Sequence, residues 1–463
     1  MSRKLPGFFW AIAAVMMVAR GDLPAADGRR PNILLLLTDQ QYGRALGAFQ
    51  PARDLRTPNL DRLVATGANF TRAYAANPRC VPSRSSLLTG HFPHETGVQE
   101  NDGAEAPPLT QPLLGKYFSD AGYATAYFGK FHLSVEDNAQ RGFAVMAHLG
   151  SIGQDAAATD DAIRFLREPH GRPFFLTVSF CNPHNICEYA RREALPDGEL
   201  PAPPDLAACP PAPANPELPA GECDTMVEQK ALRAGIADYR YLEAYSADDW
   251  RRYRWAYFRM IEKVDAQLGR ILAALHDADP GGNTLVVFTS DHGECAGAHG
   301  FGEKVVFYEE SVLVPFVLNW PEHVQPGPRT ALVNTGIDLL PTLCDLAGIP
   351  RPEGLPGRSL RTLAPGAPPA NWRSFVVAEN LQEAGAARVH GRMVRTERFK
   401  YCVYDRGERR ESLFDELADP LEKTNLAYDS AYRSQIDRCR SHLREHAGSF
   451  RDATALALLA NLP

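Results

Sequence analysis

The residues with the clearest chemical potential lie between Cys80 and Gly90, in the run Cys-Val-Pro-Ser-Arg-Ser-Ser-Leu-Leu-Thr-Gly. Pro82 suits the first turn of a helix, where its missing N–H costs nothing, and Gly90 suits the helix end. We therefore expect a helix whose free N–H groups and positive dipole end lie near Cys80 and favour a bound anion. Arg84 adds a fixed positive charge to this end. A thiol in such a field has a low pKa, so one interpretation is a cysteine hydrolase.

Four apolar runs elsewhere in the chain are typical of strands, and each is followed by charged or metal-binding side chains. The runs span residues 32–38, 124–128, 174–180 and 284–289. The side chains that follow them are Asp39 and Gln40, Lys130 and His132, His184, and Asp291 and His292. Open α/β sheets bind ligands beyond the carboxyl ends of their strands, so we expect these residues to meet at one end of a sheet.

The elements that position these residues alternate between strand-like and helical patterns, which is typical of an α/β fold. A helix is expected from Thr57-Pro58 to a stop at Gly67, and a long amphipathic helix over 249–277. The segment 186–247 is irregular and dense in proline between 200 and 219. Since long loops in compact domains usually serve a function, we expect this segment to cover the active-site face.

The character of the chain changes after about residue 365. Short antiparallel strands are expected over 374–379, 392–396 and 400–404, followed by the segment 411–426 and a terminal helix. The sequence thus predicts a large mixed, mostly parallel sheet flanked by helices, with a small C-terminal antiparallel-sheet subdomain. The expected boundaries are a signal peptide at 1–26, a catalytic α/β domain at 27–370 and a C-terminal α+β subdomain at 371–463.

The run from Cys80 to Gly90 resembles the signature of the type I sulfatases, which belong to the alkaline-phosphatase-like superfamily. The match includes the core Cys-X-Pro-X-Arg and the Leu-Thr-Gly that follows it. In that family a dedicated enzyme oxidises the first cysteine to formylglycine, an aldehyde whose hydrate is the nucleophile. The resemblance extends from about Pro31 to about Tyr428 and includes the Leu-Phe-Asp-Glu-Leu run of the C-terminal subdomain.

The resemblance implies a metal site. Its ligands would be Asp39, Gln40, Asp291, His292 and the modified Cys80. Gln40 stands where the family frequently has Asp, and His292 where many members have Asn. The Gln carbonyl can still bind a hard cation, whereas imidazole suits Zn²⁺ or Mn²⁺ better than Ca²⁺. We favour Ca²⁺ because oxygen ligands dominate the set, and leave Mg²⁺, Mn²⁺ and Zn²⁺ open.

The resemblance also assigns roles around the sulfate. Lys130, in Gly-Lys-Phe-His-Leu, and Lys304, in Gly-Phe-Gly-Glu-Lys, match the sulfate-binding lysines. His132 matches the histidine that bonds to the formylglycine hydrate, His184 faces the leaving group, and Arg84 supports the hydrate. His91, His94 and His299 lie near the motifs without a matching role, so structural positions are expected for them.

These assignments imply a sulfatase that hydrolyses a sulfate ester, with a sulfated carbohydrate as the expected substrate. A formylglycine-generating, sulfatase-maturating enzyme is the implied partner. One alternative is a phosphonate or phosphate ester hydrolase of the same superfamily. A second alternative is a non-catalytic glycan-binding protein with a sulfatase fold, which the intact set of catalytic residues disfavours.

The N-terminus is typical of an export signal. Arg3 and Lys4 precede an apolar run over 8–19, and the small residues Ala25 and Ala26 follow at a plausible cleavage site. No lipid-attachment cysteine occurs in this segment, so we expect a periplasmic or secreted protein without a stable membrane anchor. The net charge of −7 gives no support to nucleic-acid binding.

Nine cysteines occur in the 463 residues, of which eight remain if Cys80 is converted. Export permits disulfides, although sequence cannot fix their connectivity. The two local candidates are Cys209 with Cys223 and Cys181 with Cys187.

Overall fold

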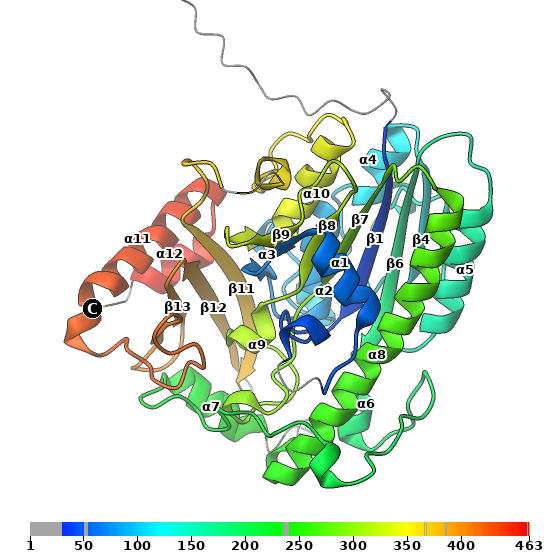
Figure 1. Ribbon diagram of the computed structural model, residues 1–463. Coiled ribbons are helices and arrows are strands. Elements are labelled where there is room, and N and C mark those ends of the chain that lie inside the picture. The colour runs from blue at the N-terminus through cyan, green and yellow to red at the C-terminus, as the bar shows by residue number, and fades with distance from the viewer. Residues whose placement is uncertain are drawn as a thin grey trace, which may run out of the picture. The chain divides into compact units, whose positions relative to one another are not determined.

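The computed structural model of the chain describes residues 30–50, 54–233, 235, 240–364, 366, 368–384, 387–460 and 462 (Figure 1). The predicted signal peptide, residues 1–26, lies outside this described part. Residues Pro31–Pro463 form one compact unit. Among the described residues, no helix has the length and apolar character needed to cross a membrane.

An eight-stranded sheet forms the centre of this unit, in the order β5-β4-β6-β1-β7-β8-β2-β9. The strands are β1 (Asn32–Asp39), β2 (Ala68–Phe70), β4 (Ala124–Gly129), β5 (Val145–Ala147), β6 (Phe174–Pro183), β7 (Thr284–Ser290), β8 (Phe316–Asn319) and β9 (Gly327–Arg329). The strands from β5 to β7 are all parallel, whereas β8 is antiparallel to both of its neighbours. The prediction of a mixed, mostly parallel sheet is therefore confirmed.

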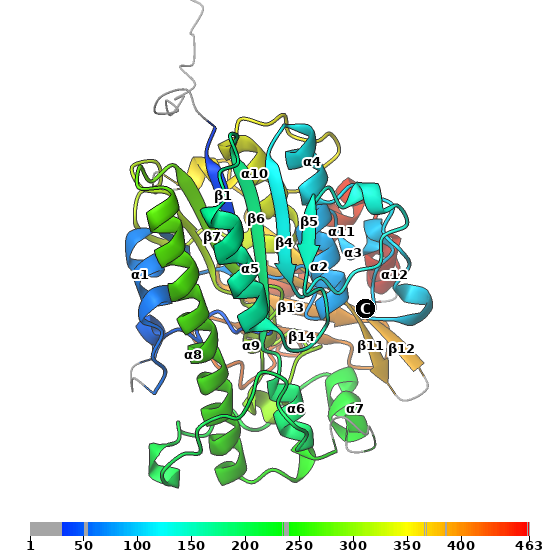
Figure 2. The same cartoon turned by 90° about the vertical axis from the view of Figure 1, so that its right-hand side faces the viewer.

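Helices cover both faces of this sheet, because β1 is apolar on both sides. Leu34 and Leu36 pack in one core with α1 (Pro58–Thr66), α5 (Asp155–Arg167) and α8 (Ala247–Ala278). Ile33, Leu35 and Leu37 face the other core, formed with α2 (Cys80–Thr89), α4 (Leu114–Asp120) and α10 (Thr335–Leu346). Figure 2 shows α5 and α8 lying across their face of the sheet. This double covering holds the central strands rigid under the residues that follow them.

A four-stranded antiparallel sheet forms the C-terminal part, as predicted. Its strands are β11 (Phe375–Ala384), β12 (Ala387–Thr396), β13 (Phe399–Tyr404) and β14 (Glu411–Asp415), and α11 (Arg433–Phe450) and α12 (Ala453–Ala460) pack against it. The strand β14 was not expected, because the resemblance had marked that segment only as a recurring run. A two-stranded sheet of β3 (Ala73–Tyr74) and β10 (Val333–Asn334) lies beside it, and Asn334 donates a hydrogen bond to the backbone of β11.

The segment 186–247 is less irregular than expected. It contains α6 (Ile186–Arg191) and α7 (Asp224–Arg233), two short helices on either side of the proline-rich stretch. Both lie beyond the carboxyl ends of the parallel strands (Figures 1 and 2), where the segment was expected to lie. The short helices α3 (Pro93–Thr96) and α9 (Glu309–Val312) complete the set of α-helices in the described residues.

Candidate active site

Two neighbouring strands deliver the acidic residues of the site. Strands β1 and β7 are parallel and in register, with Thr38 opposite Ser290. The residues that come next, Asp39 and Asp291, are fully buried side by side at the carboxyl edge of the sheet. Asp291 Oδ1 accepts hydrogen bonds from the backbone N–H groups of Gln40 and His292, which fixes the direction of its carboxylate.

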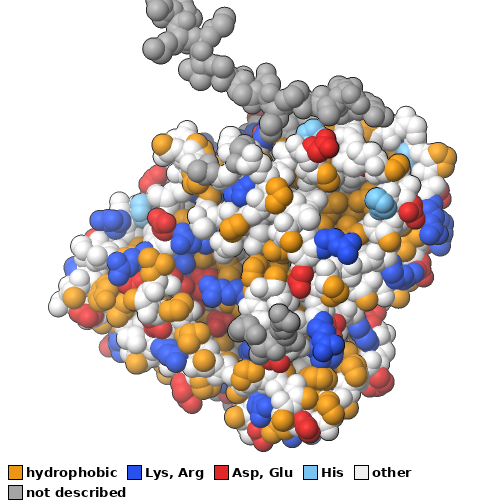
Figure 3. Space-filling model, viewed as in Figure 1, with side chains coloured by type: hydrophobic (Ala, Val, Ile, Leu, Met, Phe, Trp, Pro, Cys, Tyr) orange, Lys and Arg blue, Asp and Glu red, His pale blue; other side chains and the backbone are white. Residues whose placement is uncertain are grey.

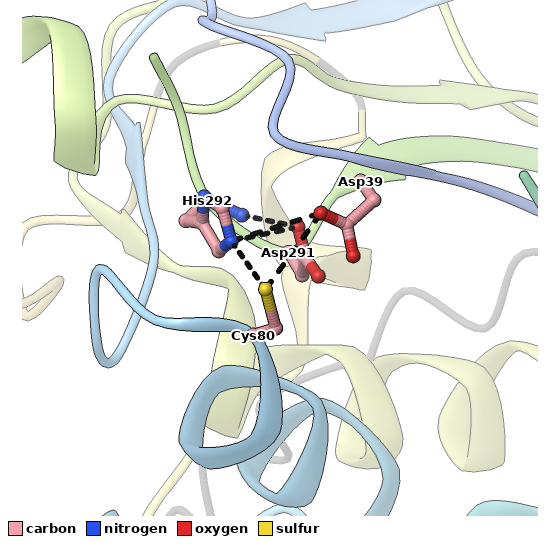
Figure 4. A group of neighbouring side chains, drawn as sticks. All are labelled: Asp39, Cys80, Asp291 and His292. Carbon is pink, nitrogen blue, oxygen red and sulfur yellow. Dashed lines mark hydrogen bonds and ion pairs between the residues drawn. The ribbon is translucent and has the colours of Figure 1, made fainter. Parts of the chain in front are cut away.

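Cys80 approaches this pair from α2. The helix begins at Cys80 and ends before Gly90, whose φ of 75° is the left-handed conformation that glycine adopts readily. The Cys80 Sγ atom lies 3.2 Å from His292 Nε2 and 3.8 Å from Asp39 Oδ1 (Figure 4). The predicted placement of Cys80 at a helix N-terminus is thus what the structure shows, and the thiol points at the two strand ends.

Arg84 joins the parts of the site together. Its guanidinium donates from Nε to Asp291 Oδ2 at 2.8 Å and from Nη2 to Asp39 Oδ2 at 2.9 Å. Its Nη1 donates to the backbone oxygen of Lys130 and to Ser179 Oγ. With its side chain only 1% exposed, Arg84 fixes both carboxylates and the loop after β4 in one arrangement.

The donor set fits a divalent cation. One ligand atom from each of Asp39, Cys80, Asp291 and His292 lies within 4.8 Å of all the others, and all four residues are buried. The Nδ1 of His292 lies 3.0 Å from the backbone oxygen of Gly293, an orientation that turns Nε2 towards Cys80 and the two carboxylates. Burial and the nearby Asp39 carboxylate raise the pKa of Asp291 to about 6, a repulsion that a bound cation would relieve.

The field at Cys80 favours an anion. Burial and Asp39 oppose ionisation of the thiol, but Lys304, Lys130 and His292 outweigh them and lower its pKa well below the ordinary value. Lys130 Nζ lies 2.8 Å from Asp39 Oδ2, and this ion pair helps to raise the pKa of Lys130 despite its burial. Nearby thiol and carboxylate groups also raise the pKa of Lys304 well above its ordinary value despite burial, so both lysines favour the charged form that binds an anion.

The Gln40 side chain lies between Lys304 and Glu294. Lys304 Nζ donates to Gln40 Oε1, and Gln40 Nε2 donates to Glu294 Oε2 at 2.6 Å. Glu294 Oε1 accepts in turn from Tyr253 Oη at 3.0 Å. The buried Glu294 carboxylate thus sets the orientation of the amide and directs its oxygen towards Lys304.

The two predicted catalytic histidines are half-buried, and each has an Nδ1 with no hydrogen-bond partner among the described residues. His132 follows Lys130 on the loop after β4 and has a φ of 53°. His184 follows β6, and burial together with Lys130 and Lys304 lowers its pKa to about 3. Each imidazole therefore has a ring nitrogen whose hydrogen-bonding capacity is unused within the described residues, which is what a role in proton transfer needs.

The remaining sequence expectations divide into structural residues and one correction. His94 contacts Glu379 of β11, and His299 stacks on Tyr308 at 3.7 Å between ring centroids. All nine cysteines are free and buried, so the expected disulfides Cys209–Cys223 and Cys181–Cys187 are wrong. Each of these four thiols has other neighbours instead; Cys187, for example, lies beside the Gln40 amide.

Several residues that hold the site were missed from the sequence. Glu294 lies only two positions after His292 and could have been found from that spacing. Tyr257 of α8 accepts from the backbone N–H of Tyr42 and donates to the backbone oxygen of Gln40, and Ser179 of β6 accepts from Arg84. Tyr257 and Ser179 had no local signal, because only the folded sheet brings them to the site.

Buried lysines around a cysteine at a helix N-terminus, at the carboxyl end of a mostly parallel sheet, define an α/β protein built to hold an anion. The sequence matches the Sulfatase family over residues 31–349 and the family described as N-sulphoglucosamine sulphohydrolase, C-terminal, over residues 297–448. The chain therefore belongs to the sulfatase family and is a sulfuric ester hydrolase.

Similar proteins agree with this assignment. The Delta 4,5-hexuronate-2-O-sulfatase of Bacteroides thetaiotaomicron is 30% identical, over 91% of this chain and 90% of that protein. The N-acetylglucosamine-6-O-sulfatase of the same organism is 25% identical, over 95% of this chain and 90% of that protein. The structure of a 2-O GAG sulfatase has a TM-score of 0.80 and 30% identity, and covers 92% of this chain and 93% of that one. The structure of a phosphonate monoester hydrolase of Agrobacterium radiobacter has a TM-score of 0.74 and 25% identity, and covers 91% of this chain and 96% of that one.

Proposed function

We propose that this sulfatase removes sulfate from a carbohydrate, with a nucleophile made by oxidation of Cys80 to formylglycine. The observation that carries the proposal is the position of Cys80, which begins α2 and places Sγ 3.2 Å from His292 Nε2 within the cluster of Asp39 and Asp291. Two similar proteins are named as sulfatases of sugar residues, which supports a carbohydrate substrate. An exported, periplasmic or secreted location is proposed on the N-terminal segment alone.

The residues at the strand ends divide the work. Lys130 and Lys304 hold the sulfate, and a hydroxyl of the formylglycine hydrate at position 80 supplies the attacking oxygen. His184 gives a proton to the leaving sugar oxygen, and His132 takes a proton from the second hydroxyl of the hydrate as sulfate is expelled. Arg84 keeps the carboxylates in place throughout.

The low pKa of His184 belongs to the substrate-free site. Burial and two neighbouring lysine charges disfavour its imidazolium there. A sulfate ester bound between Lys130 and Lys304 would neutralise part of this charge, and so favour protonation of His184 when the general acid is needed.

A divalent metal held by Asp39, Asp291, His292 and, once its oxygen turns from Lys304, Gln40 would withdraw charge from the sulfate oxygens. We propose Ca²⁺, since three of these four ligands are oxygens. Chelation should abolish activity, and Ca²⁺ should restore it. Restoration by Zn²⁺ alone would instead favour His292 as the dominant ligand and a phosphohydrolase-like site.

The competing candidate is a phosphonate or phosphate ester hydrolase. Its support is His292 in the metal cluster together with the likeness to the phosphonate monoester hydrolase structure. Matched sulfate and phosphate esters with the same leaving group separate the two. The proposal requires a higher kcat/KM for the sulfate ester, and loss of turnover in Cys80→Ala; retained turnover in that variant would overturn it.

A further inference from the structure

A cavity of ≈ 380 Å³ opens beside the active site and has no role in the account above. Its lining includes Val81, the neighbour of Cys80, and the catalytic His132. The other walls are largely apolar, with Val98, Leu109 and Phe131 among them. This volume and lining are those of a small-ligand pocket, and its position suits the part of a substrate that lies next to the sulfate.

One side chain in this cavity carries an uncompensated charge. Arg141 is half-buried, and its guanidinium carbon lies 5.1 Å from the centroid of the Phe131 ring. The Arg141 Nε atom is buried without a hydrogen-bond partner, and no carboxylate of the described residues forms an ion pair with this side chain. The nearby Asp137 carboxylate is exposed and accepts from the backbone N–H of Ala139 instead.

Two arginines that are more deeply buried than Arg141 have carboxylate partners. Arg84 pairs with Asp39 and Asp291, and Arg392 pairs with Asp452. Burying a guanidinium without a partner costs free energy, and an oxyanion that accepts two of its N–H groups would offset that cost. Arg141 therefore stands in the arrangement of an anion-binding arginine whose acceptor comes from outside the chain.

A second donor lines the same cavity. Asn101 Oδ1 accepts a hydrogen bond from the backbone N–H of Val81 at 3.0 Å. This bond fixes the amide and leaves its Nδ2 group as a donor on a residue that lines the cavity. Arg141 and Asn101 could thus bind one acidic group together, with Phe131 supporting the guanidinium from behind.

We propose that the cavity lined by Val81, Asn101, Phe131, His132 and Arg141, which we call the Arg141 pocket, binds a second anionic group of the sulfated substrate. This group is an oxyanion of the same sugar chain, either the carboxylate of a uronic acid or a further sulfate. The inference rests on the proposed carbohydrate substrate, and it makes the enzyme selective for acidic saccharides over neutral sugars that carry one sulfate.

The test uses full-length, modified enzyme and matched saccharides. One pair of sulfated disaccharides differs only in a uronic carboxylate, present or reduced to the alcohol, and a second pair differs only in a further sulfate. Wild type, Arg141→Gln, Arg141→Lys and the exposed control Arg164→Gln are compared by KM and kcat. Arg164 lies on α5 and pairs with Asp161, so it controls for the loss of one positive charge.

We expect Arg141→Gln to raise KM about 10- to 100-fold more for the acidic member of one pair than for its neutral counterpart. The pair that shows this difference identifies the anion, and Arg141→Lys should recover part of it. Equal losses on both members of both pairs, or no loss, would overturn the inference and leave the proposed function intact. Turnover of an aryl sulfate but of no saccharide by wild type would overturn the carbohydrate substrate and this inference together.

Discussion

Among the described residues, the active-site cluster and a second cluster of histidine and carboxylate groups differ in what their polar atoms contact. The active-site cluster consists of Asp39, Cys80, Asp291 and His292. The junction cluster consists of His94, Glu379, Arg392 and Asp452, where α3 meets the C-terminal sheet and the loop between α11 and α12. Its His94, Glu379 and Asp452 have the same compact spacing as metal ligands.

The donors of the junction cluster are paired within the protein. His94 Nδ1 contacts Glu379 Oε1 at 2.5 Å, and its Nε2 contacts the backbone oxygen of Phe450 at 3.0 Å. Arg392 binds Asp452 through two N–H groups, at 2.7 and 2.9 Å. With its donors and acceptors satisfied in this way, the cluster stabilises the contact of α3 with the C-terminal sheet and has no open position for a ligand among the described residues.

The active-site end is incomplete by comparison. His132 Nδ1 and His184 Nδ1 lack hydrogen-bond partners among the described residues, and two carboxylates face a thiol across a small gap. The same residue types therefore serve structure where the protein completes their contacts, and chemistry where it leaves contacts for a substrate or ion. On the face seen in Figure 3, acidic and basic side chains are interspersed, so the positive field belongs to the buried site and not to that face.

The largest effect is expected from removing a carboxylate of the active-site cluster. Asp39→Asn or Asp291→Asn removes a carboxylate that Arg84 holds at 2.9 or 2.8 Å, and should lower kcat/KM by about 10³-fold or more. Calorimetric titration with Ca²⁺ should show a matching loss of metal binding. Asp345→Asn, which loses a partly exposed pair with Arg361, is the control and should leave both unchanged. Unchanged Ca²⁺ binding in the Asp39 and Asp291 variants would contradict the metal assignment.

The next effect separates proton transfer from sulfate binding. His184→Ala should reduce kcat/KM for a sugar sulfate by about 10²–10⁴-fold, because a sugar alkoxide needs a proton in order to leave. An activated aryl sulfate should be affected much less, since its phenolate leaves without help. Lys130→Ala or Lys304→Ala should lower kcat/KM for both substrates. If His184→Ala impairs both substrates equally, His184 positions the sulfate and does not protonate the leaving group.

A smaller effect is expected from changing residues that orient a metal ligand without binding the metal themselves. In the native protein, Gln40 Nε2 donates to the Glu294 carboxylate at 2.6 Å. Glu294→Gln keeps the size of the side chain but replaces one acceptor oxygen by an NH₂ group, which can repel the Gln40 NH₂ group and turn the Gln40 amide over. We expect metal affinity to fall about 10- to 100-fold, the usual range for residues that orient a ligand. Titration of the apo-enzyme with Ca²⁺ measures it directly. Tyr253→Phe, which removes one hydrogen bond to the same carboxylate, should have a weaker effect in the same direction.

The smallest effect on activity, and a measurable one on stability, is expected at the junction cluster. Burial opposes the charge of His94, but Glu379 and the Phe450 carbonyl outweigh it and raise its pKa to about 9. The nearby His446 stays neutral, since burial lowers its pKa to about 3. A raised folded-state pKa contributes stability that is complete below pH 6.5 and is lost as pH rises through about 9.

His94→Gln should therefore lower the free energy of unfolding by about 2 kcal/mol at pH 6, the scale of a lost charged hydrogen bond. The difference in unfolding free energy between variant and wild type should shrink above pH 9. Urea unfolding of both proteins at pH 6 and at pH 9.5 measures it. A difference that stays the same at pH 6 and at pH 9.5 would show that packing, and not the imidazolium, holds the junction. Turnover by the folded variant at pH 6 should match wild type, because His94 contacts no active-site residue in the described structure.

Much of the active site was predictable from sequence because its residues follow strands. The apolar run 32–38 fixed β1, and Asp39 had to come at its carboxyl end. Cys80 was placed by Pro82 and Gly90, which mark the two ends of a helix. What could not be predicted depends on tertiary contacts: Arg84 turned out to hold both carboxylates, and Glu294 to orient Gln40. The predicted disulfides were wrong for a related reason, since spacing along the chain does not determine whether two thiols come together in the fold.

The central claim is that Cys80 supplies the nucleophile after conversion to formylglycine. Its most direct test is the mass of the peptide that contains residue 80, from protein co-expressed with a formylglycine-generating enzyme and sorted by activity. The account predicts a peptide about 18 Da lighter than the thiol form, the difference between CH₂–SH and CHO, in an amount proportional to sulfate release. An unshifted Cys80 peptide in fully active enzyme would contradict it.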